Sequence, residues 1–252
     1  MKKVKLNKIL KNGKAIFLAY DQGLEHGPTD FNDKNVDPKY IIEIAKKSKI
    51  NALIFQKGIV EKYQKEIKKS KIPLILKLNG KTKIRKDDPF SPLICTVNEA
   101  IDLGADAVGY TIYIGSKYES KMFEEFEKVE QKAHAKSLPV IAWIYPRGKN
   151  VNNDTSKEMI AYSARVGLEL GADIVKIKYG NNSNDLEWAV KSAGKTKVMI
   201  SGGTKRSEID FLRQIKDIMK AGAIGMAIGR NIWQHPKPLE IIKKIQKIVF
   251  GK

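Results

Sequence analysis

The sequence predicts a (β/α)₈ barrel, the α/β fold also called a TIM barrel, built as a single domain over residues 1–252. Eight short apolar runs alternate with amphipathic segments of helical length. The chain has 252 residues, and such a barrel typically takes about 250. Three similar segments place a glycine between an expected helix and the next strand: Leu103–Ala107, Leu170–Ile174 and Ala221–Gly225. A left-handed glycine commonly ends a helix, so these segments indicate a repeated turn from helix to strand.

The expected strands are continuous apolar runs rich in β-branched residues. Such strands, when they alternate with helices, indicate a parallel sheet that helices cover. In chain order they are Ala15–Tyr20, Ala52–Phe55, Pro73–Lys77, Ala107–Tyr110, Val140–Ile144, Asp173–Lys178, Lys197–Ile200 and Ile224–Ile228. The helices expected between them include Tyr40–Lys49, Ser120–Lys136, Ser156–Leu170 and Glu208–Lys220. A doubly wound sheet is the alternative, but eight units in this length favour the closed barrel.

The composition is that of a globular protein. Apolar residues make up 42% of the chain and charged residues 30%, which excludes a disordered chain. No stretch approaches the roughly 20 apolar residues of a membrane span. The basic N-terminal segment Met1–Leu6 lacks the apolar core of a signal peptide. We therefore expect a cytoplasmic protein with no membrane partner.

The net charge of +19 favours an anionic partner such as a phosphorylated metabolite, nucleic acid or acidic lipid. The lysines are spread over the whole chain, mostly on expected helix surfaces, rather than clustered on one face. Basic and aromatic residues are not interleaved as a single-strand binding platform needs. We therefore expect no nucleic acid partner. One cysteine and three histidines also argue against a closed zinc site with four Cys and His ligands.

Two lysines lie in the sixth expected strand, near the carboxyl edge of the barrel where catalytic groups gather. Because side chains alternate along a strand, Lys176 and Lys178 share one face, and Val175 and Ile177 share the other. The apolar face must pack against helices. The lysines then point into the barrel, with Lys176 the deeper of the two.

A buried lysine loses hydration, which favours its neutral amine and makes it a nucleophile able to form a Schiff base with a ketone. Lys77, at the end of the third expected strand, is a rival nucleophile. The alternative is that these lysines extend toward the mouth of the barrel or bind a substrate anion. The spacing alone leaves the choice among Lys77, Lys176 and Lys178 open.

The fifth expected strand continues into an aromatic and basic segment. Trp143 and Tyr145 share one face, opposite Ala142 and Ile144. If the aliphatic face packs against helices, the two aromatic side chains point toward the expected site. A tyrosine hydroxyl there could exchange a proton with a substrate oxygen, although both rings could simply fill the mouth of the barrel. Arg147, beside a glycine, suits a phosphate contact.

Three further segments at strand ends are rich in glycine. The loop Tyr20–Pro28 follows the first strand and carries Asp21, Glu25 and His26. Asp21 could orient a substrate hydroxyl or pair with a catalytic lysine. A divalent-metal site from these three residues is conceivable, but their spacing is no standard ligand pattern.

The other two glycine-rich segments resemble phosphate cradles. They are Ser201–Thr204, after the seventh strand, and Gly229–Asn231, after the eighth. Glycines let backbone N–H groups approach an anion, and in barrels of this class the loops after these two strands often bind phosphate.

Together these segments resemble the archaeal-type class I fructose-1,6-bisphosphate aldolases over nearly the whole chain. The matching segments are Ala19–Pro28, Leu74–Thr82, Ala107–Tyr113, Trp143–Gly148, Val175–Tyr179, Ile200–Gly203 and Gly229–Gln234. The resemblance implies a barrel that works through a lysine Schiff base, with no metal and no other cofactor. It also implies a phosphorylated sugar as the substrate, and we expect a homo-oligomer.

The resemblance implies residue roles as well. Lys176 matches the Schiff-base lysine, Tyr145 the proton-transfer residue, and Trp143 and Asp21 further catalytic positions. The candidates for binding substrate and its phosphates are His26, Lys77, Arg147, Lys178, Ser201, Gly202, Gly203, Gly229 and Arg230. The resemblance thus resolves the choice among the three lysines in favour of Lys176.

The chain departs from the family pattern at two places, and the second bears on specificity for the aldehyde end of the substrate. Gln22 stands where members often have histidine, and Gly180-Asn181-Asn182 stands where they often have Thr-Gly-Asp. A sister group of amino-deoxy-heptulosonate synthases shares the lysine but lacks a tryptophan at the position of Trp143. We therefore expect reversible cleavage of fructose 1,6-bisphosphate, with a related transaldol-type synthase, an aldolase for another ketose phosphate, or a non-enzymatic barrel that binds phosphosugar or nucleic acid as the alternatives.

Overall fold

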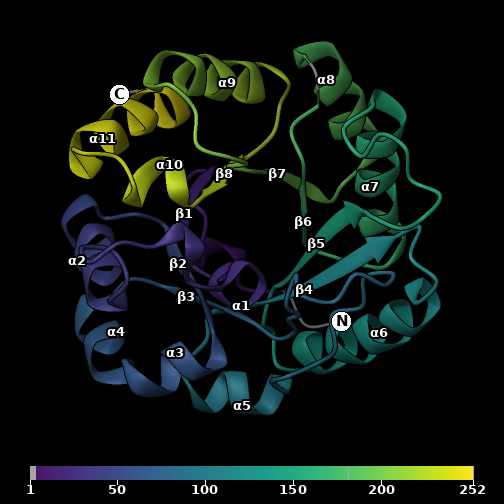
Figure 1. The fold of residues 1–252 in the computed structure, drawn as a ribbon, viewed down its shortest axis with the longest axis horizontal. Coiled ribbons are helices and arrows are strands. Elements are labelled where there is room, and N and C mark those ends of the chain that lie inside the picture. Colours follow the sequence, from purple (N-terminus) through teal and green to yellow (C-terminus); the bar gives the residue numbers. More distant parts are fainter. Residues whose placement is uncertain (1–3, 181, 252) are drawn as a thin grey trace.

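The strands close into a parallel barrel in the order of the sequence. The computed structural model describes residues 4–180 and 182–251, and within them each of β1 to β8 pairs with its sequence neighbours while β8 pairs with β1. The strands lie at the centre of Figure 1 and the helices surround them. This closed order confirms the predicted barrel and excludes the doubly wound alternative, whose strand order reverses.

The strands begin and end close to the predicted positions. They are β1 Ala15–Ala19, β2 Ala52–Gln56, β3 Leu74–Lys77, β4 Ala107–Ile114, β5 Val140–Pro146, β6 Ile174–Ile177, β7 Lys197–Ser201 and β8 Gly225–Ile228. The largest difference is in β4, which was expected to end at Tyr110. It continues to Ile114 because it stays paired with β5 as far as Pro146. β6 ends one residue earlier than expected, so Lys178 lies in the loop that follows.

The helices lie between the strands, before β1 and after β8. They are η1 Leu6–Lys8, α1 Gly23–His26, η2 Gly27–Asp30, α2 Pro38–Ser48, α3 Lys57–Lys62, α4 Gln64–Ser70, α5 Val97–Asp102, α6 Glu119–Ala135, α7 Lys157–Glu169, α8 Ser183–Ser192, α9 Glu208–Lys220, α10 Arg230–Trp233 and α11 Pro238–Phe250. Polar side chains accept backbone N–H groups at the start of several helices, for example Ser156 before α7 and Ser207 before α9. The glycines of the three repeated turns, Gly104, Gly171 and Gly222, all have positive φ, as predicted.

Alternation along the strands divides the core into two layers. An inner layer fills the barrel, and an outer layer packs between the strands and the helices. In β6, Val175 and Ile177 belong to the outer layer, whereas Ile174 belongs to the inner one. Lys176 therefore points inward, as the alternation predicted, because the apolar face is taken up by the helices.

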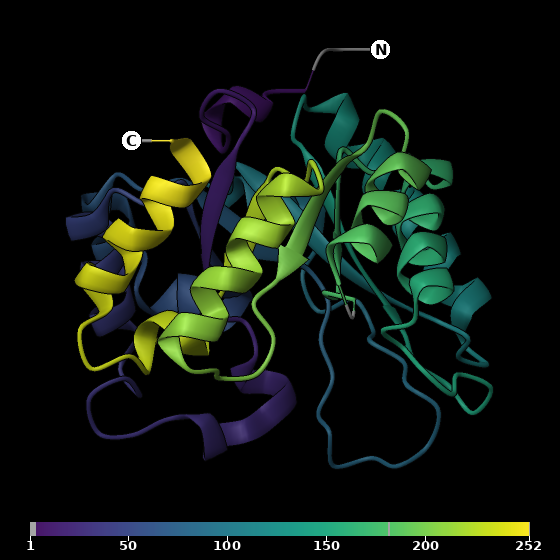
Figure 2. The same cartoon turned by 90° about the horizontal axis from the view of Figure 1, so that it is seen from above.

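The two ends of the barrel differ. η1 and the end of α11 lie at the top of Figure 2, whereas α1, η2 and the long loop 78–96 lie at the bottom. The loops at the lower end leave the carboxyl ends of the strands, which is the end that carries the site. Within residues 4–180 and 182–251, no helix combines the length and the apolar composition that a membrane span needs.

Candidate active site

A cavity of about 380 Å³ opens at the carboxyl ends of the strands. The structure brings all of the predicted site residues to its walls: Asp21, His26, Lys77, Trp143, Tyr145, Arg147, Lys176, Lys178, Ser201, Gly202, Gly203, Gly229 and Arg230. They come from the carboxyl ends of six strands and from the short helices α1 and α10, which the closed barrel brings together. Gln22, Glu25 and Thr155 join the same walls.

Lys176 lies at the bottom of the cavity and is only 6% exposed. Its Nζ lies 4.9 Å from the centre of the Trp143 ring. Burial lowers the pKa of Lys176 to about 8, Asp21 opposes this shift, and the neighbouring charge of Lys77 adds to it. At neutral pH this amine is therefore uncharged far more often than an exposed lysine amine, as a nucleophile must be.

The two rival lysines each have an anionic partner. Lys77 Nζ lies 3.3 Å from Asp21 Oδ2, and Lys178 forms an ion pair with Asp154. A carboxylate stabilises the charged ammonium, which carries no lone pair and cannot attack a ketone. Among the described residues no carboxylate lies within ion-pair distance of Lys176. The geometry therefore favours Lys176 as the nucleophile.

Asp21 is ionised in this environment. Burial alone would raise the pKa of its carboxyl, but the positive charges of Lys77 and Lys176 outweigh burial and lower it. The carboxylate is 7% exposed and reaches the cavity. It can accept a hydrogen bond from a substrate hydroxyl while it balances the two buried lysines.

Trp143 and Tyr145 lie on the inner face of β5, as predicted. Trp143 packs in the inner layer, and Ala142 and Ile144 pack in the outer one. Burial first, and then the charge of Asp21, raise the pKa of Tyr145 well above its usual value. Its phenol therefore stays protonated and is available as a proton donor.

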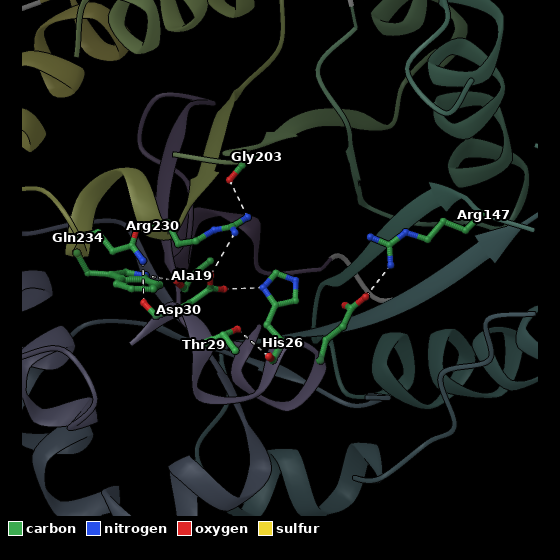
Figure 3. A network of polar contacts seen from close by, with 10 residues as sticks. Ala19, His26, Thr29, Asp30, Arg147, Gly203, Arg230 and Gln234 are labelled. Carbon is green, nitrogen blue, oxygen red and sulfur yellow. Dashed lines mark hydrogen bonds and ion pairs between the residues drawn. The ribbon is translucent and has the colours of Figure 1, made fainter. Parts of the chain in front are cut away.

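The loop after β1 holds two arginines at the mouth of the barrel (Figure 3). Asp30 Oδ2 lies 2.6 Å from His26 Nδ1, and Asp30 Oδ1 lies 3.4 Å from Arg230 Nη1. On the other side of His26 in this view, Arg147 donates to Glu25 Oε1 at 2.6 Å. Sequence reasoning missed Asp30, although its place four residues after His26 was a usable signal. Sequence reasoning considered Glu25 only as a metal ligand.

The loop after β7 is fixed by a buried side chain of α10. Asn231 Nδ2 donates to the carbonyls of Gly202 and Thr204 at 2.9 Å, and its Oδ1 accepts the N–H of Arg206. Arg230 donates in turn to the Gly203 carbonyl. The loops after β7 and β8 therefore form one rigid rim at the mouth, where a phosphate cradle was expected.

The conceivable metal trio does not converge. Asp21 contacts Lys77, Glu25 contacts Arg147 and His26 contacts Asp30, so each side chain is engaged elsewhere. Within residues 4–180 and 182–251 no three acidic, histidine or cysteine side chains gather as a metal site.

The structure gives local contacts for two of the residues that depart from the family pattern, Gly180 and Asn182. Gly180 packs against α7, where an added Cβ would lie 2.7 Å from the side chain of Ile160. Asn182 caps α8 by accepting the N–H of Asp185. Asn181 lies outside the described residues. Gln22 lines the cavity, and its Nε2 has no partner among the described residues.

Comparison with known proteins agrees with this geometry. Residues 15–235 match the DeoC/LacD family of aldolases. The class 1 fructose-bisphosphate aldolase of Thermoproteus tenax is 48% identical over 96% of this chain and 91% of its own length. The chain belongs to the DeoC/LacD aldolase family. Within that family its relatives place it among the class I, Schiff-base fructose-1,6-bisphosphate aldolases, and this confirms the resemblance seen in the motifs.

Two further comparisons locate this aldolase within the family. A solved archaeal fructose-1,6-bisphosphate aldolase, whose catalytic lysine is bound to the carbinolamine intermediate, is 46% identical with a TM-score of 0.93 over 98% of each chain. A 2-amino-3,7-dideoxy-D-threo-hept-6-ulosonate synthase of Archaeoglobus fulgidus is 30% identical over 99% of this chain and 91% of its own length. The aldolases are thus clearly more similar to this chain than that synthase is.

Proposed function

We propose that this chain cleaves fructose 1,6-bisphosphate reversibly to dihydroxyacetone phosphate and glyceraldehyde 3-phosphate, through a Schiff base on Lys176. The observation that carries the proposal is the environment of Lys176. Its amine is buried, has a pKa of about 8, and lies at the bottom of a cavity whose mouth holds two arginines. A sugar that carries a phosphate at each end fits this distribution of charge.

The reaction begins with attack of the neutral Lys176 amine on the C2 ketone. The carbinolamine that forms loses water to give an iminium, which withdraws electrons from C3. The C3–C4 bond then breaks as a base takes the proton of the C4 hydroxyl, and glyceraldehyde 3-phosphate leaves. The remaining enamine is protonated at C3, and hydrolysis of the iminium releases dihydroxyacetone phosphate and the free amine.

The other buried groups support this sequence of steps. Tyr145 is the proton donor in these steps, since burial and Asp21 keep its phenol protonated. The Asp21 carboxylate orients substrate hydroxyls and holds Lys77, which leaves Lys176 free to react. Trp143 closes the inner wall of the cavity and keeps water from the reactive amine.

The two phosphates occupy opposite sides of the mouth. Ser201, Gly202, Gly203, Gly229 and Arg230 form the rim that takes the phosphate nearest the Schiff-base carbon. Arg147 lies across His26 from Arg230 and takes the distal phosphate, with His26 and Lys178 as further polar contacts. Both arginines are held by carboxylates, Asp30 and Glu25, which a bound phosphate can replace.

The proposal includes a metal-independent, cytoplasmic enzyme that forms a homo-oligomer. The iminium supplies the electron withdrawal that a metal would otherwise provide. The sugar phosphates carry charges that prevent passive passage through membranes, which supports a cytoplasmic location. The neighbouring helices α7 and α8 expose Tyr162 and Trp188, which supports contact between copies of the chain.

Borohydride trapping with dihydroxyacetone phosphate tests the proposal. Reduction of the imine should fix the ketose carbon to one lysine, and peptide mapping should find it on Lys176. Lys176→Ala should abolish trapping, and Lys178→Met should retain it. An adduct on Lys77 or Lys178 contradicts the assignment, and absence of any adduct contradicts Schiff-base chemistry. A panel of ketose and aldose phosphates then separates the aldolase from the synthase alternative.

A further inference from the structure

A glycine of β4 faces the inside of the barrel, beside Lys77 and the indole of Trp143. Val108 and Tyr110 belong to the outer layer, so Gly109 between them faces inward. In the sheet Gly109 pairs with Lys77 of β3 on one side and with Ile141 of β5 on the other. A side chain at this position would enter the space below the cavity.

That space is filled by the indole of Trp143. A Cβ added at Gly109 would lie 1.8 Å from Cζ3 and 2.0 Å from Cη2 of this ring, far closer than any real contact. Trp143 is 1% exposed and is packed among residues of the inner layer. A rigid ring enclosed in this way cannot move aside without disturbing its neighbours.

The reactive amine of Lys176 lies over the face of the same indole. Lys176 Nζ lies over the ring at 4.9 Å from its centre, and Lys77 Nζ lies over it at 5.8 Å. A cation over the face of an indole is stabilised by the negative charge of that face. When Lys176 becomes an iminium, the positive charge stays near the same nitrogen and therefore over the same ring.

We propose that Gly109 is a positioning residue for the Schiff-base step. By having no side chain it admits the Trp143 indole beneath Lys176, where the indole stabilises the cationic iminium. The proposal rests on the proposed function, because it assigns the iminium to Lys176. It adds that the Trp143 indole fits beneath Lys176 only if position 109 on β4 carries no side chain. The residues of the site on β5 and β6 do not by themselves show this requirement.

The backbone of Gly109 does not itself require a glycine. Its carbonyl accepts the N–H of Leu78 at 2.8 Å, a bond that alanine preserves. Its φ is not among the positive values found in the chain, so alanine can adopt its conformation. The effect of Gly109→Ala therefore arises from contact between the new Cβ and the indole.

A double-mutant cycle with Trp143→Leu tests this inference. Gly109→Ala should lower both kcat and the rate of borohydride trapping by about tenfold or more, because the displaced ring no longer supports the iminium. KM should stay within about threefold, because the phosphate contacts are untouched. In the Trp143→Leu background, itself slow in trapping, Gly109→Ala should change the rate by less than about threefold, since the clash is gone. Gly58→Ala is the matched control, because a Cβ there meets nothing within 4 Å.

Three results would overturn the inference: trapping by folded Gly109→Ala near the parent rate, an equal loss from Gly109→Ala in both backgrounds, or trapping at the parent rate by Trp143→Leu. If Gly109→Ala alone fails to fold, the comparison of Trp143→Leu with the double variant decides. If the double variant also fails to fold, the cost does not come from the indole and the inference is wrong. Failure of the parent to trap dihydroxyacetone phosphate would refute the proposed function instead.

Discussion

The ammonium of Lys77 lies 3.3 Å from the carboxylate of Asp21, and both groups are buried beside Lys176. This pair sets the charge that the reactive amine experiences. Lys77 repels a proton on Lys176 directly, and it also neutralises the carboxylate that would otherwise hold that proton. The pair therefore keeps Lys176 reactive without touching the ketone carbon.

Lys77→Met should move the pH dependence of trapping upward. Lys77 lowers the pKa of Lys176, which is about 8, and its loss removes this effect while it frees Asp21 to stabilise the charged amine. Both changes raise the pKa, so the neutral fraction at pH 7 falls about tenfold for each unit of upward shift. The measurement is the rate of borohydride trapping between pH 6 and pH 10, with pH values chosen to span the expected midpoint.

Lys69→Met, an exposed lysine of α4, is the control for a general loss of positive charge. It should leave the midpoint unchanged. A midpoint in Lys77→Met that is unchanged or moves to lower pH would show that Lys77 does not set the reactivity of Lys176.

The sequence was sufficient to predict the residues that a single strand orients. Alternation within β6 predicted that Lys176 points inward and Val175 outward, because one strand has only two faces. The repeated glycine turns predicted the βα units for a similar reason. In each case the information lies within a short segment of the chain. The prediction of a closed barrel then required only the number of such units.

Contacts between distant strand ends could not be predicted from the sequence. The pairing of Asp30 with Arg230 joins residues 200 positions apart, and nothing near Arg230 marks its partner. The fit of Trp143 over Gly109 depends on the register of β4 with β5, which periodicity does not give. Sequence reasoning therefore found most of the groups that line the cavity but few of the groups that hold them in place.

Substitution of the two arginines should show which of them binds which phosphate of the substrate. Dihydroxyacetone phosphate carries one phosphate, next to the carbon that forms the Schiff base, and the proposal assigns that phosphate to the Arg230 side. Arg230→Met should therefore weaken both trapping and cleavage, whereas Arg147→Met should weaken cleavage alone. A hydrogen bond to a charged group is worth about 1.5–3 kcal/mol, so KM should rise by roughly 10–100-fold.

Arg147→Met also leaves Glu25 without its partner at the mouth. The variant Arg147→Met/Glu25→Gln is the matched control, because it removes the stranded carboxylate as well. The double variant should still trap dihydroxyacetone phosphate as the parent does and still bind the bisphosphate weakly. Restored cleavage in the double variant would place the distal phosphate elsewhere.

Activity should survive removal of metal ions. The iminium withdraws electrons from the breaking bond, and the side chains once considered as metal ligands have other partners. Cleavage by the parent chain should stay within about twofold after prolonged treatment with EDTA, a change well below any catalytic contribution of a metal. Loss of cleavage that zinc restores would require a different mechanism.

Tyr145→Phe should separate cleavage from Schiff-base formation. The substitution keeps the ring in its place on β5 and removes only the hydroxyl, which is protonated because burial and Asp21 raise its pKa well above the usual value. Acid–base groups typically contribute about 10²–10⁴-fold, so turnover should fall by that factor. Trapping should persist if the hydroxyl acts chiefly after the carbinolamine, because Lys176 and the rim of the phosphate site remain. Slow cleavage with retained adduct is therefore the expected pair of results, measured on one preparation. Turnover within about threefold of the parent would assign the hydroxyl to structure alone, below the range of acid–base catalysis, and would make Asp21 the next candidate for proton transfer.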